Sequence, residues 1–336
     1  MGEMLRHRRS AISSRPYDGR RMLAGPHACR LTPRLDVDRL RADLAALRAF
    51  PMGTEESYFR APGERHVGWS VLSLRSQNGE AKETTSGGPG LTDFQDTPAM
   101  RAAPYLREVV EAIPGPKRSV RLSVLPPGGS IARHDDVVLS LEHGLVRLHA
   151  PIQTGPEVEL ELGGERVEMA PGELWYGDFT LPHAVENRGR DERVHLLIEV
   201  AVTPALRSIF PADFWDARDV VTVEAPAPPA APVEAYACRF TGPSLFSRLL
   251  PRSWTSWQRF EGALAPRSGE LVMSINGTPA IALDPRGGDR FVFRGGPPCV
   301  VLEVERGEGG VRALKLRSRV RKQWYTIPLP LRSLDP

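Results

Sequence analysis

The stretch from residue 119 to residue 202 constrains the fold more than any other part of the chain, because its hydrophobic pattern repeats every second residue in short runs. The first run alternates Val120, Leu122 and Val124 with smaller or polar side chains. Glycine and proline separate the runs, and Gly163-Gly164 is a strong signal for a two-residue β-hairpin. Short strands joined by such turns are typical of an antiparallel sandwich or barrel. We therefore expect a mainly β domain.

Helical and loop segments are expected before this stretch. Asp36 can cap a helix with leucines on one face, and Pro104 opens a second helix that ends before Pro114. Residues 66–76 favour a strand. Residues 77–97 are rich in Gly, Ser, Thr and Asp, which predicts a long loop of the kind that often binds a ligand or covers a site.

The chain is expected to have four parts. Residues 1–30 are Arg-rich and aperiodic and predict a loosely ordered basic arm, while residues 31–222 contain the main domain. A Pro/Ala-rich linker at 223–235 is expected to be extended and semi-rigid. Residues 236–336 predict a small β module with 16 Lys and Arg against 8 Asp and Glu, a net charge of +8, so the preceding residues carry −5 of the total of +3.

A basic stripe is expected in the small module. Lys315, Arg317, Arg319 and Arg321 alternate with aliphatic residues, which places four cations on one face of a strand. Such a face is usually solvated. The alternative is contact with an anionic partner, such as an acidic carrier domain, a nucleic acid or a membrane surface. Only one Trp-Tyr pair lies close enough for base stacking, so a nucleic acid is not favoured.

The cysteines and the start of the chain indicate the compartment. Cys29, Cys238 and Cys299 are odd in number, far apart and without metal-ligand spacing, which suits a reducing environment. The Arg-rich start lacks the apolar core of a signal peptide, and no apolar run is long enough to cross a bilayer. We expect a cytoplasmic protein.

A candidate metal-ligand set lies within the alternating stretch. Side chains two apart in a strand face the same side, so His134 and Asp136 are expected to point together while Asp135 points away. His183 follows 49 positions after His134. Two imidazoles and one carboxylate occupy one face of an octahedral Fe(II) and leave three adjacent positions, which suit a chelating 2-oxo acid and O2. Either histidine alone is more often a surface or core residue.

Four further polar residues fit a small dicarboxylate beside such a metal. Arg193 lies 10 residues after His183 on an aliphatic strand, where an unpaired guanidinium is costly, so it needs an anion. Arg147 and His149 share one face of another strand, and Ser123 occupies the polar face of its own. Arginine can hold a carboxylate through two hydrogen bonds. Taken singly, either arginine is more often an ordinary salt-bridge partner.

Five segments in order carry a family resemblance: GWSVLSLRS (68–76), LSVLPPGGSIARHDD (122–136), VRLHAPIQT (146–154), APGELWY (170–176) and LPHAVENRGRDERVHLLIEV (181–200). In their order and spacing they resemble the aspartyl/asparaginyl β-hydroxylase-like family of Fe(II)/2-oxoglutarate-dependent oxygenases, which includes bacterial cis-proline hydroxylases. The resemblance covers about residues 35–205. The combination is specific, whereas the His-x-Asp pair alone is a weak signal.

The resemblance implies a fold and a co-substrate site. The fold is a double-stranded β-helix, a cupin-like jelly roll with flanking N-terminal helices, and the three candidate ligands would hold Fe(II) at its open end. Arg193, helped by Ser123, would bind the far carboxylate of 2-oxoglutarate. Arg147 and His149 would lie near its keto-acid end.

The activity implied is a dioxygenase that hydroxylates an unactivated C–H bond of an amino acid or amino-acid residue, consumes O2, and releases succinate and CO2. Some family members that act on protein side chains lack the carboxylate ligand, so Asp136 places this chain nearer to the small-molecule amino-acid hydroxylases. One alternative is a non-catalytic β-barrel that binds or senses a small carboxylate. Another makes the C-terminal module the working part and the main domain a degenerate scaffold, and the intact ligand set argues against it.

Overall fold

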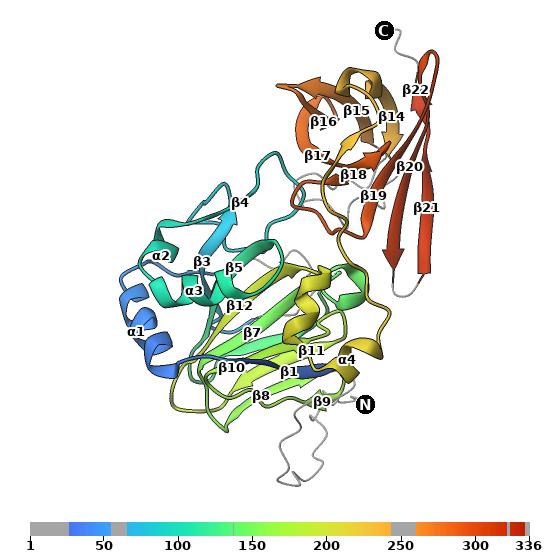
Figure 1. Cartoon of the computed structure of the whole chain (residues 1–336). Helices are drawn as coiled ribbons and strands as arrows, with labels where there is room; N and C mark the ends of the chain where they lie inside the picture. Colours follow the sequence, from blue (N-terminus) through green and yellow to red (C-terminus); the bar gives the residue numbers. More distant parts are fainter. Residues whose placement is uncertain (1–26, 55–65, 137, 243–259, 321–322, 333–336) are drawn as a thin grey trace, which may run out of the picture.

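The computed structural model describes residues 27–54, 66–136, 138–242, 260–320 and 323–332. It contains two β units that follow one another along the chain, joined by the segment after α4 (Figure 1). Among the described residues, no helix is both long and apolar enough to cross a membrane.

Eight strands of the first unit form two facing antiparallel sheets. They are β5 (Lys117–Leu125), β6 (Ser130–His134), β7 (Leu145–Gln153), β8 (Val158–Leu162), β9 (Glu165–Arg166), β10 (Glu173–Gly177), β11 (His183–Asn187) and β12 (Arg193–Ala201). The larger sheet contains the order β10-β7-β12-β5, and the smaller sheet has the order β6-β11-β8-β9. The chain crosses repeatedly between the two sheets, which is the connectivity of a double-stranded β-helix. The predicted fold class is confirmed.

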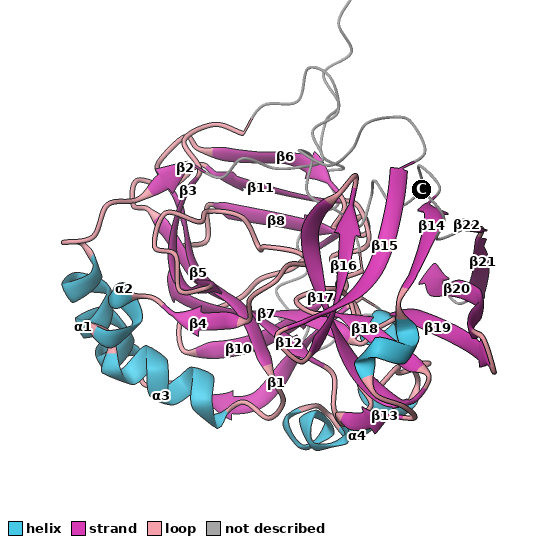
Figure 2. Cartoon of the chain, turned by 90° about the horizontal axis from the view of Figure 1, so that it is seen from above, coloured by secondary structure: helices cyan, strands magenta, loops and turns pink. Residues whose placement is uncertain are grey.

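Further strands extend the larger sheet, and helices cover its outer face (Figure 2). The added strands are β1 (Ala28–Arg34), β2 (Gly53–Thr54), β3 (Ser70–Gln77) and β4 (Phe94–Asp96). The covering elements are α1 (Val37–Leu47), α2 (Pro98–Arg101), α3 (Pro104–Ala112), η2 (Pro204–Ile209) and α4 (Ala212–Asp216). A large apolar core fills the space between these helices and the sheet, and a smaller one lies between the two sheets.

The two N-terminal helices begin where the sequence predicts. The Asp36 side chain accepts hydrogen bonds from the backbone N–H groups of Asp38 and Arg39, which satisfies two donors of the first turn of α1. Pro104 is the first residue of α3, where the N–H that proline lacks would have no partner within the helix. Both helices turn their apolar faces onto the larger sheet.

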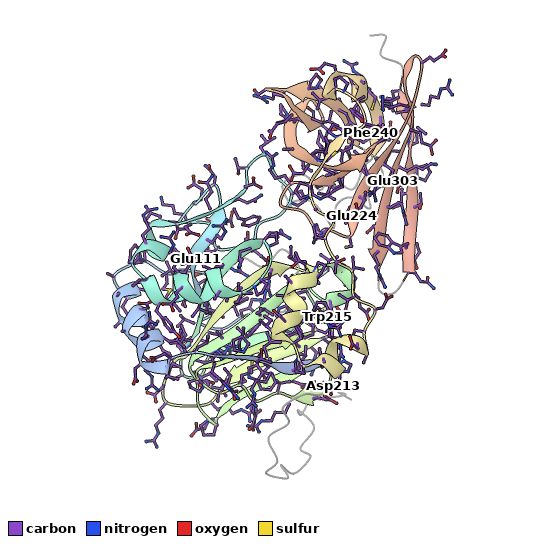
Figure 3. The ribbon with its side chains drawn as sticks, in the orientation of Figure 1. Glu111, Asp213, Trp215, Glu224, Phe240 and Glu303 are labelled. Carbon is purple, nitrogen blue, oxygen red and sulfur yellow. The ribbon has the colours of Figure 1, made fainter. Side chains whose placement is uncertain are left out.

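The C-terminal module is a second β structure with its own core. Its strands are β14 (Cys238–Gly242), β15 (Phe260–Arg267), β16 (Glu270–Ile275), β17 (Thr278–Gly288), β18 (Arg290–Phe293), β19 (Val300–Gly307), β20 (Gly310–Val320), β21 (Gln323–Leu329) and β22 (Leu331–Arg332). The chain runs from β21 through Pro330 into β22, which pairs with β14 at the other end of the sheet. The sheet thus returns on itself around a core that includes Phe240 (Figure 3).

The boundaries of the parts differ in detail from those expected. The predicted arm, residues 1–30, falls mainly outside the described residues, but residues 28–30 already belong to β1. The Pro/Ala segment is extended only in part, and it is not free of the module. Its strand β13 (Ala227–Pro229) pairs in parallel with β17, and η3 (Val233–Tyr236) follows it. These proline-bearing residues can pair because they lie at the margin of the sheet.

Candidate metal centre

Three potential metal ligands converge at one end of the space between the two sheets. His134 is the last residue of β6 and His183 the first of β11, and the two are paired across the smaller sheet. One donor atom from each histidine and one from Asp136 all lie within 4.8 Å of one another. The structure therefore brings together the three residues expected from the sequence, and Asp135 is exposed.

Asp136 reaches this position by a different route from the one expected. The strand β6 ends at His134, so strand alternation does not direct Asp136. Its backbone N–H donates instead to the carbonyl of Phe179 at 2.8 Å. Its carboxylate accepts a hydrogen bond from Nη1 of Arg147, whose Nη2 binds Glu199 Oε1 at 2.8 Å. Arg147, itself held by Glu199, thereby fixes the position of the Asp136 carboxylate.

Backbone carbonyls fix the orientation of both imidazoles. Nδ1 of His134 lies 2.8 Å from the carbonyl of Ala132, and Nδ1 of His183 lies 2.9 Å from that of Leu181. A carbonyl can only accept, so Nδ1 must carry the proton in each ring. The Nε2 lone pairs are therefore left for a metal ion, an arrangement common among metal-binding histidines.

The electrostatics of the centre favour the protonation states in which Asp136 and His183 can bind a metal ion. Burial opposes ionisation of Asp136, but Arg147, together with His183 and His134, holds the pKa of this carboxyl below its ordinary value. Burial lowers the pKa of His183 to about 4. At neutral pH the centre consequently contains a carboxylate and a neutral His183 imidazole, and metal binding requires both forms.

A buried guanidinium lies on the larger sheet, away from the three ligands. Arg193 begins β12, its side chain is buried, and it contacts Ser123 Oγ at 3.4 Å and His195 Nδ1 at 2.9 Å. Its Nε has no hydrogen-bond partner, and it forms no ion pair with a carboxylate of the described residues. Burial lowers its pKa to about 9. An anion at this place would remove a large desolvation cost.

His149 lies between the metal centre and Arg193. Its ring stacks on Phe179, with 4.5 Å between ring centroids, and the Phe179 ring is 5.0 Å from that of His183. Both ring nitrogens of His149 are buried and have no hydrogen-bond partner within the described parts of the chain. Burial, with the neighbouring charge of Arg193, lowers the pKa of His149 well below its ordinary value. This neutral ring therefore offers an unused polar edge within the interior.

A cavity of about 270 Å³ opens beside Arg193 and His195. Val158, Leu160 and Met169 supply part of its apolar wall. None of the three candidate metal ligands is among the described residues that line it. The cavity thus gives space at the arginine end of the interior rather than at the metal end.

The sequence left two residues of β12 unassigned, although strand alternation could have identified them. Arg193, His195 and Glu199 lie at even spacings along one face, and all three are buried. His195 Nδ1 accepts a hydrogen bond from Arg193, and no described residue hydrogen-bonds to Nε2 of the same ring. Glu199 accepts from Arg147 as described above.

Two residues from a segment before β3 complete the wall of the centre. The ring of His66 lies 5.7 Å from that of His134 and 4.9 Å from that of Trp69. Trp69 Nε1 donates to Ser123 Oγ at 2.9 Å, so this indole holds the serine that also contacts Arg193. No spacing rule in the sequence identifies either residue.

The basic stripe of the module is ion-paired. Lys315 pairs with Glu305, Arg317 binds Glu303 at 3.1 Å, and Arg319 pairs with Asp219 of the first unit. Arg321 lies outside the described residues. Lys315 and Arg317 thus belong to a partly exposed, ion-paired face, whereas Arg319 is buried, so the stripe is not solvated along its whole length; an anionic partner stays a prediction.

The first unit is similar in sequence to known proteins. A family model described as aspartyl/asparaginyl beta-hydroxylase matches residues 35–202, half of the chain. The curated L-proline cis-4-hydroxylase of Rhizobium meliloti (strain 1021) is 28% identical over 175 residues, which are 51% of this chain and 59% of that protein. The chain thus matches about three fifths of the length of this relative.

Solved structures give partial overlaps. A 2OG-Fe(II) oxygenase family oxidoreductase from Burkholderia pseudomallei is 13% identical, with a TM-score of 0.38, over 54% of this chain and 93% of that chain. A Trichoplax adhaerens prolyl hydroxylase, solved with a peptide of hypoxia inducible factor, is 13% identical, with a TM-score of 0.37, over 52% and 84%. The module, residues 236–336, lies outside the family match.

Proposed function

The chain belongs to the aspartyl/asparaginyl β-hydroxylase family, and from this premise we propose that it is an Fe(II)- and 2-oxoglutarate-dependent dioxygenase that hydroxylates an amino acid or an amino-acid residue. The observation that carries the proposal is the convergence of His134, Asp136 and His183 within 4.8 Å. The name of the L-proline cis-4-hydroxylase relative supports an amino-acid substrate.

The residues present fit such a metal. Both histidines have Nδ1 engaged by a backbone carbonyl, which leaves Nε2 as the donor, and Asp136 is held as a carboxylate by Arg147. Two imidazoles with one carboxylate form a facial donor set that suits non-haem Fe(II). Bound Fe(II), with 2-oxoglutarate and O2, supplies the chemistry that inserts one oxygen atom into a C–H bond while 2-oxoglutarate becomes succinate and CO2.

The protein's own residues would bind and orient the co-substrate. We assign the far carboxylate of 2-oxoglutarate to Arg193, which is buried without an acidic partner among the described residues and has Ser123 beside it. Between this arginine and the metal centre, His149 offers ring nitrogens that no described residue engages. Arg147 would act through the Asp136 carboxylate that it contacts, close to the keto-acid end. The buried walls keep the site dry, which strengthens each of these contacts.

A direct test combines turnover with metal binding. Purified protein with Fe(II), ascorbate and 2-oxoglutarate is incubated with a panel of amino acids and peptides, and succinate and products heavier by one oxygen atom are measured by mass spectrometry. We expect at least one panel member to give both products. Binding of 2-oxoglutarate without succinate from any panel member would instead favour a protein that only binds or senses the carboxylate.

Two neighbouring carboxylates give a matched pair of variants for the metal. Asp136→Ala removes the proposed ligand, whereas Asp135→Ala removes an exposed carboxylate one position away. We expect Asp136→Ala to weaken Fe(II) binding by about 10-fold or more, because one metal ligand is lost. Anaerobic calorimetry measures this affinity. Asp135→Ala should bind Fe(II) as the unaltered chain does. The reverse result would show that the wrong carboxylate has been assigned.

A further inference from the structure

A loop of the first unit is hydrogen-bonded into the sheet of the C-terminal module. The bridging loop, defined here as residues 83–91, lies between β3 and β4, and Figure 1 shows this region in cyan reaching towards the module. The ladder between β17 and β18 pairs Leu283 with Phe293. At the next rung, Gly90 of the bridging loop is inserted between Ala282 and Arg294.

Three backbone hydrogen bonds define this insertion. The N–H of Arg294 donates to the carbonyl of Ala282 at 2.9 Å, as in an ordinary ladder. The N–H of Ala282 donates to the carbonyl of Gly90 at 3.0 Å, and the N–H of Gly90 donates to the carbonyl of Arg294 at 2.9 Å. Gly90 therefore takes the place of the second hydrogen bond of this rung, the one that the N–H of Ala282 would otherwise donate to the carbonyl of Arg294.

The side chain of Arg294 holds the same loop. Its Nη1 donates to the carbonyl of Leu91 at 3.2 Å. Within the module, its guanidinium also binds Asp284 at 2.8 Å and Glu270 at 2.7 Å, so it is anchored by two carboxylates while it contacts the loop. Three groups from two residues of the module thus fix two successive residues of the loop.

The other end of the bridging loop contacts the residues behind the metal centre. The carbonyl of Thr84 accepts from Nη1 of Arg121 at 2.9 Å, and Ser86 Oγ lies 3.4 Å from Nη2 of Arg147. Between these two ends, the side chain of Gln77 donates to the carbonyl of Gly88 at 2.6 Å. The loop is consequently held at the module, in its middle and beside Arg147.

We propose that the C-terminal module is a brace that fixes the bridging loop against Arg147, and that Arg294 is a positioning residue acting through this loop on the Asp136 carboxylate. The contacts run from Arg294 to the loop, from Ser86 to Arg147, and from Arg147 to Asp136. This gives residues 236–336 a role in the order of the centre without any contact with a substrate. The proposal goes beyond the hydroxylase function and does not depend on which substrate is used.

The first measurement is hydrogen exchange on the full chain without substrate. Gly90 donates to Arg294 in the wild-type chain, so peptides covering residues 83–91 should be protected, and Arg294→Met should speed their exchange by about 10-fold or more. Arg290→Met is the matched control. Arg290 lies on the same strand, β18, and binds Glu224 at 2.8 Å rather than the loop. Unprotected loop amides in the wild-type chain, or equal exchange in all three proteins, would overturn the proposal.

The second measurement is the affinity of the full chain for Co(II), followed by its visible absorption. Arg294→Met should weaken Co(II) binding about 3- to 10-fold, less than loss of a direct outer-sphere partner, and Arg294→Lys should restore part of it. Arg290→Met should bind Co(II) normally. Unchanged Co(II) affinity in Arg294→Met would overturn the positioning role, even where the loop had loosened.

A second variant keeps the test valid if Arg294→Met disrupts the module. A Cβ at Gly90 would come within 2.7 Å of Gln77 Nε2 and of no atom of the module among the nearest contacts. Gly90→Ala therefore disturbs the loop from the first unit's side. We expect faster exchange at residues 83–91 and weaker Co(II) binding with unchanged protection of β17 and β18. Wild-type behaviour in both measurements would contradict the proposal.

Discussion

The surroundings of Arg193 illustrate how a binding residue can be recognised by the ion-pair partner that it lacks among the described residues. A buried guanidinium normally has a carboxylate partner, yet among the residues that the structure describes Arg193 hydrogen-bonds to Ser123 and the neutral ring of His195 and to no carboxylate. The folded chain carries the desolvation cost of this cation without the matching ion pair. A residue that only stabilised the fold would not be arranged in this way, so its position favours anion binding.

Replacement of Arg193 by methionine should have opposite effects on binding and on stability. We expect Arg193→Met to weaken 2-oxoglutarate binding by about 100-fold or more, because charge-assisted hydrogen bonds contribute roughly 1.5–3 kcal/mol each. We also expect the free energy of unfolding of the protein without ligand to rise by about 1–3 kcal/mol, because a buried unpaired cation is removed. Calorimetry with Mn(II) present and urea unfolding measure the two quantities.

A second arginine of the same cavity serves as the control. Arg166 lines the cavity but is half-exposed and lies 3.5 Å from Glu168. Arg166→Met should change 2-oxoglutarate affinity less than about 3-fold, because an exposed ion pair contributes little. Equal losses in the two variants would mean that the cavity's general charge, and not Arg193, attracts the ligand.

Single residues were predictable from the sequence where local geometry determines them. Spacing chose Asp136 over Asp135, although the strand that motivated the choice ends at His134 and a hydrogen bond to Phe179 does the positioning. The positions of His66 and Trp69 beside the centre could not be predicted in this way, because they depend on how a segment distant in the sequence packs. Long-range contacts of this kind leave no period in a sequence.

Elements were predictable wherever their own residues decide their conformation. The hairpin between β8 and β9 turns at Gly163 and Gly164, with φ values of 60° and 86°, as the two-residue turn requires. By contrast, β1 was missed although Cys29 and Leu31, which are buried, alternate with Arg30 and Thr32. The run is short and contains Pro33, so its alternation is a weak signal, and pairing with β10 at the sheet edge completes the strand.

The two glycines of this hairpin should separate stability from metal binding. Alanine at either position is strained by the positive φ and should cost about 1–2 kcal/mol of unfolding free energy. Only at Gly163 would a Cβ approach Leu181, at 3.1 Å, and the N–H of Gly163 donates to Pro182 beside His183. We therefore expect Gly163→Ala to weaken Co(II) binding several-fold, whereas Gly164→Ala, whose Cβ meets open space, should not. Urea unfolding and Co(II) titration test this, and equal affinities would refute it.

At the scale of the whole molecule, two cores meet at a junction that includes polar and apolar contacts. The apolar clusters of the first unit and of the module share no residue, but Val138 of the first unit packs against the module's cluster. The contacts between the units include the Arg319–Asp219 ion pair and the two hydrogen bonds of Gly90. A separate ion pair joins Arg290 of the module to Glu224 of the connecting segment (Figure 3). Arg319 is buried in this junction whereas Asp219 is exposed, and an interface between two units with separate cores can orient them without making them unfold together.

The three cysteines can test this separation without any substitution. Cys29 is buried in the core of the first unit, and Cys238 and Cys299 are buried in the module. Burial raises the pKa of Cys29 and of Cys299 to about 12 and that of Cys238 to about 11, so the native thiols are protonated and inert at pH 8. Brief alkylation at increasing urea, with each cysteine quantified by mass spectrometry, reports the unfolding of each unit. We expect Cys238 and Cys299 to share one midpoint and Cys29 to have another, because each core loses its own buried surface cooperatively. A single midpoint for all three would instead mean that the junction couples the units into one folding domain.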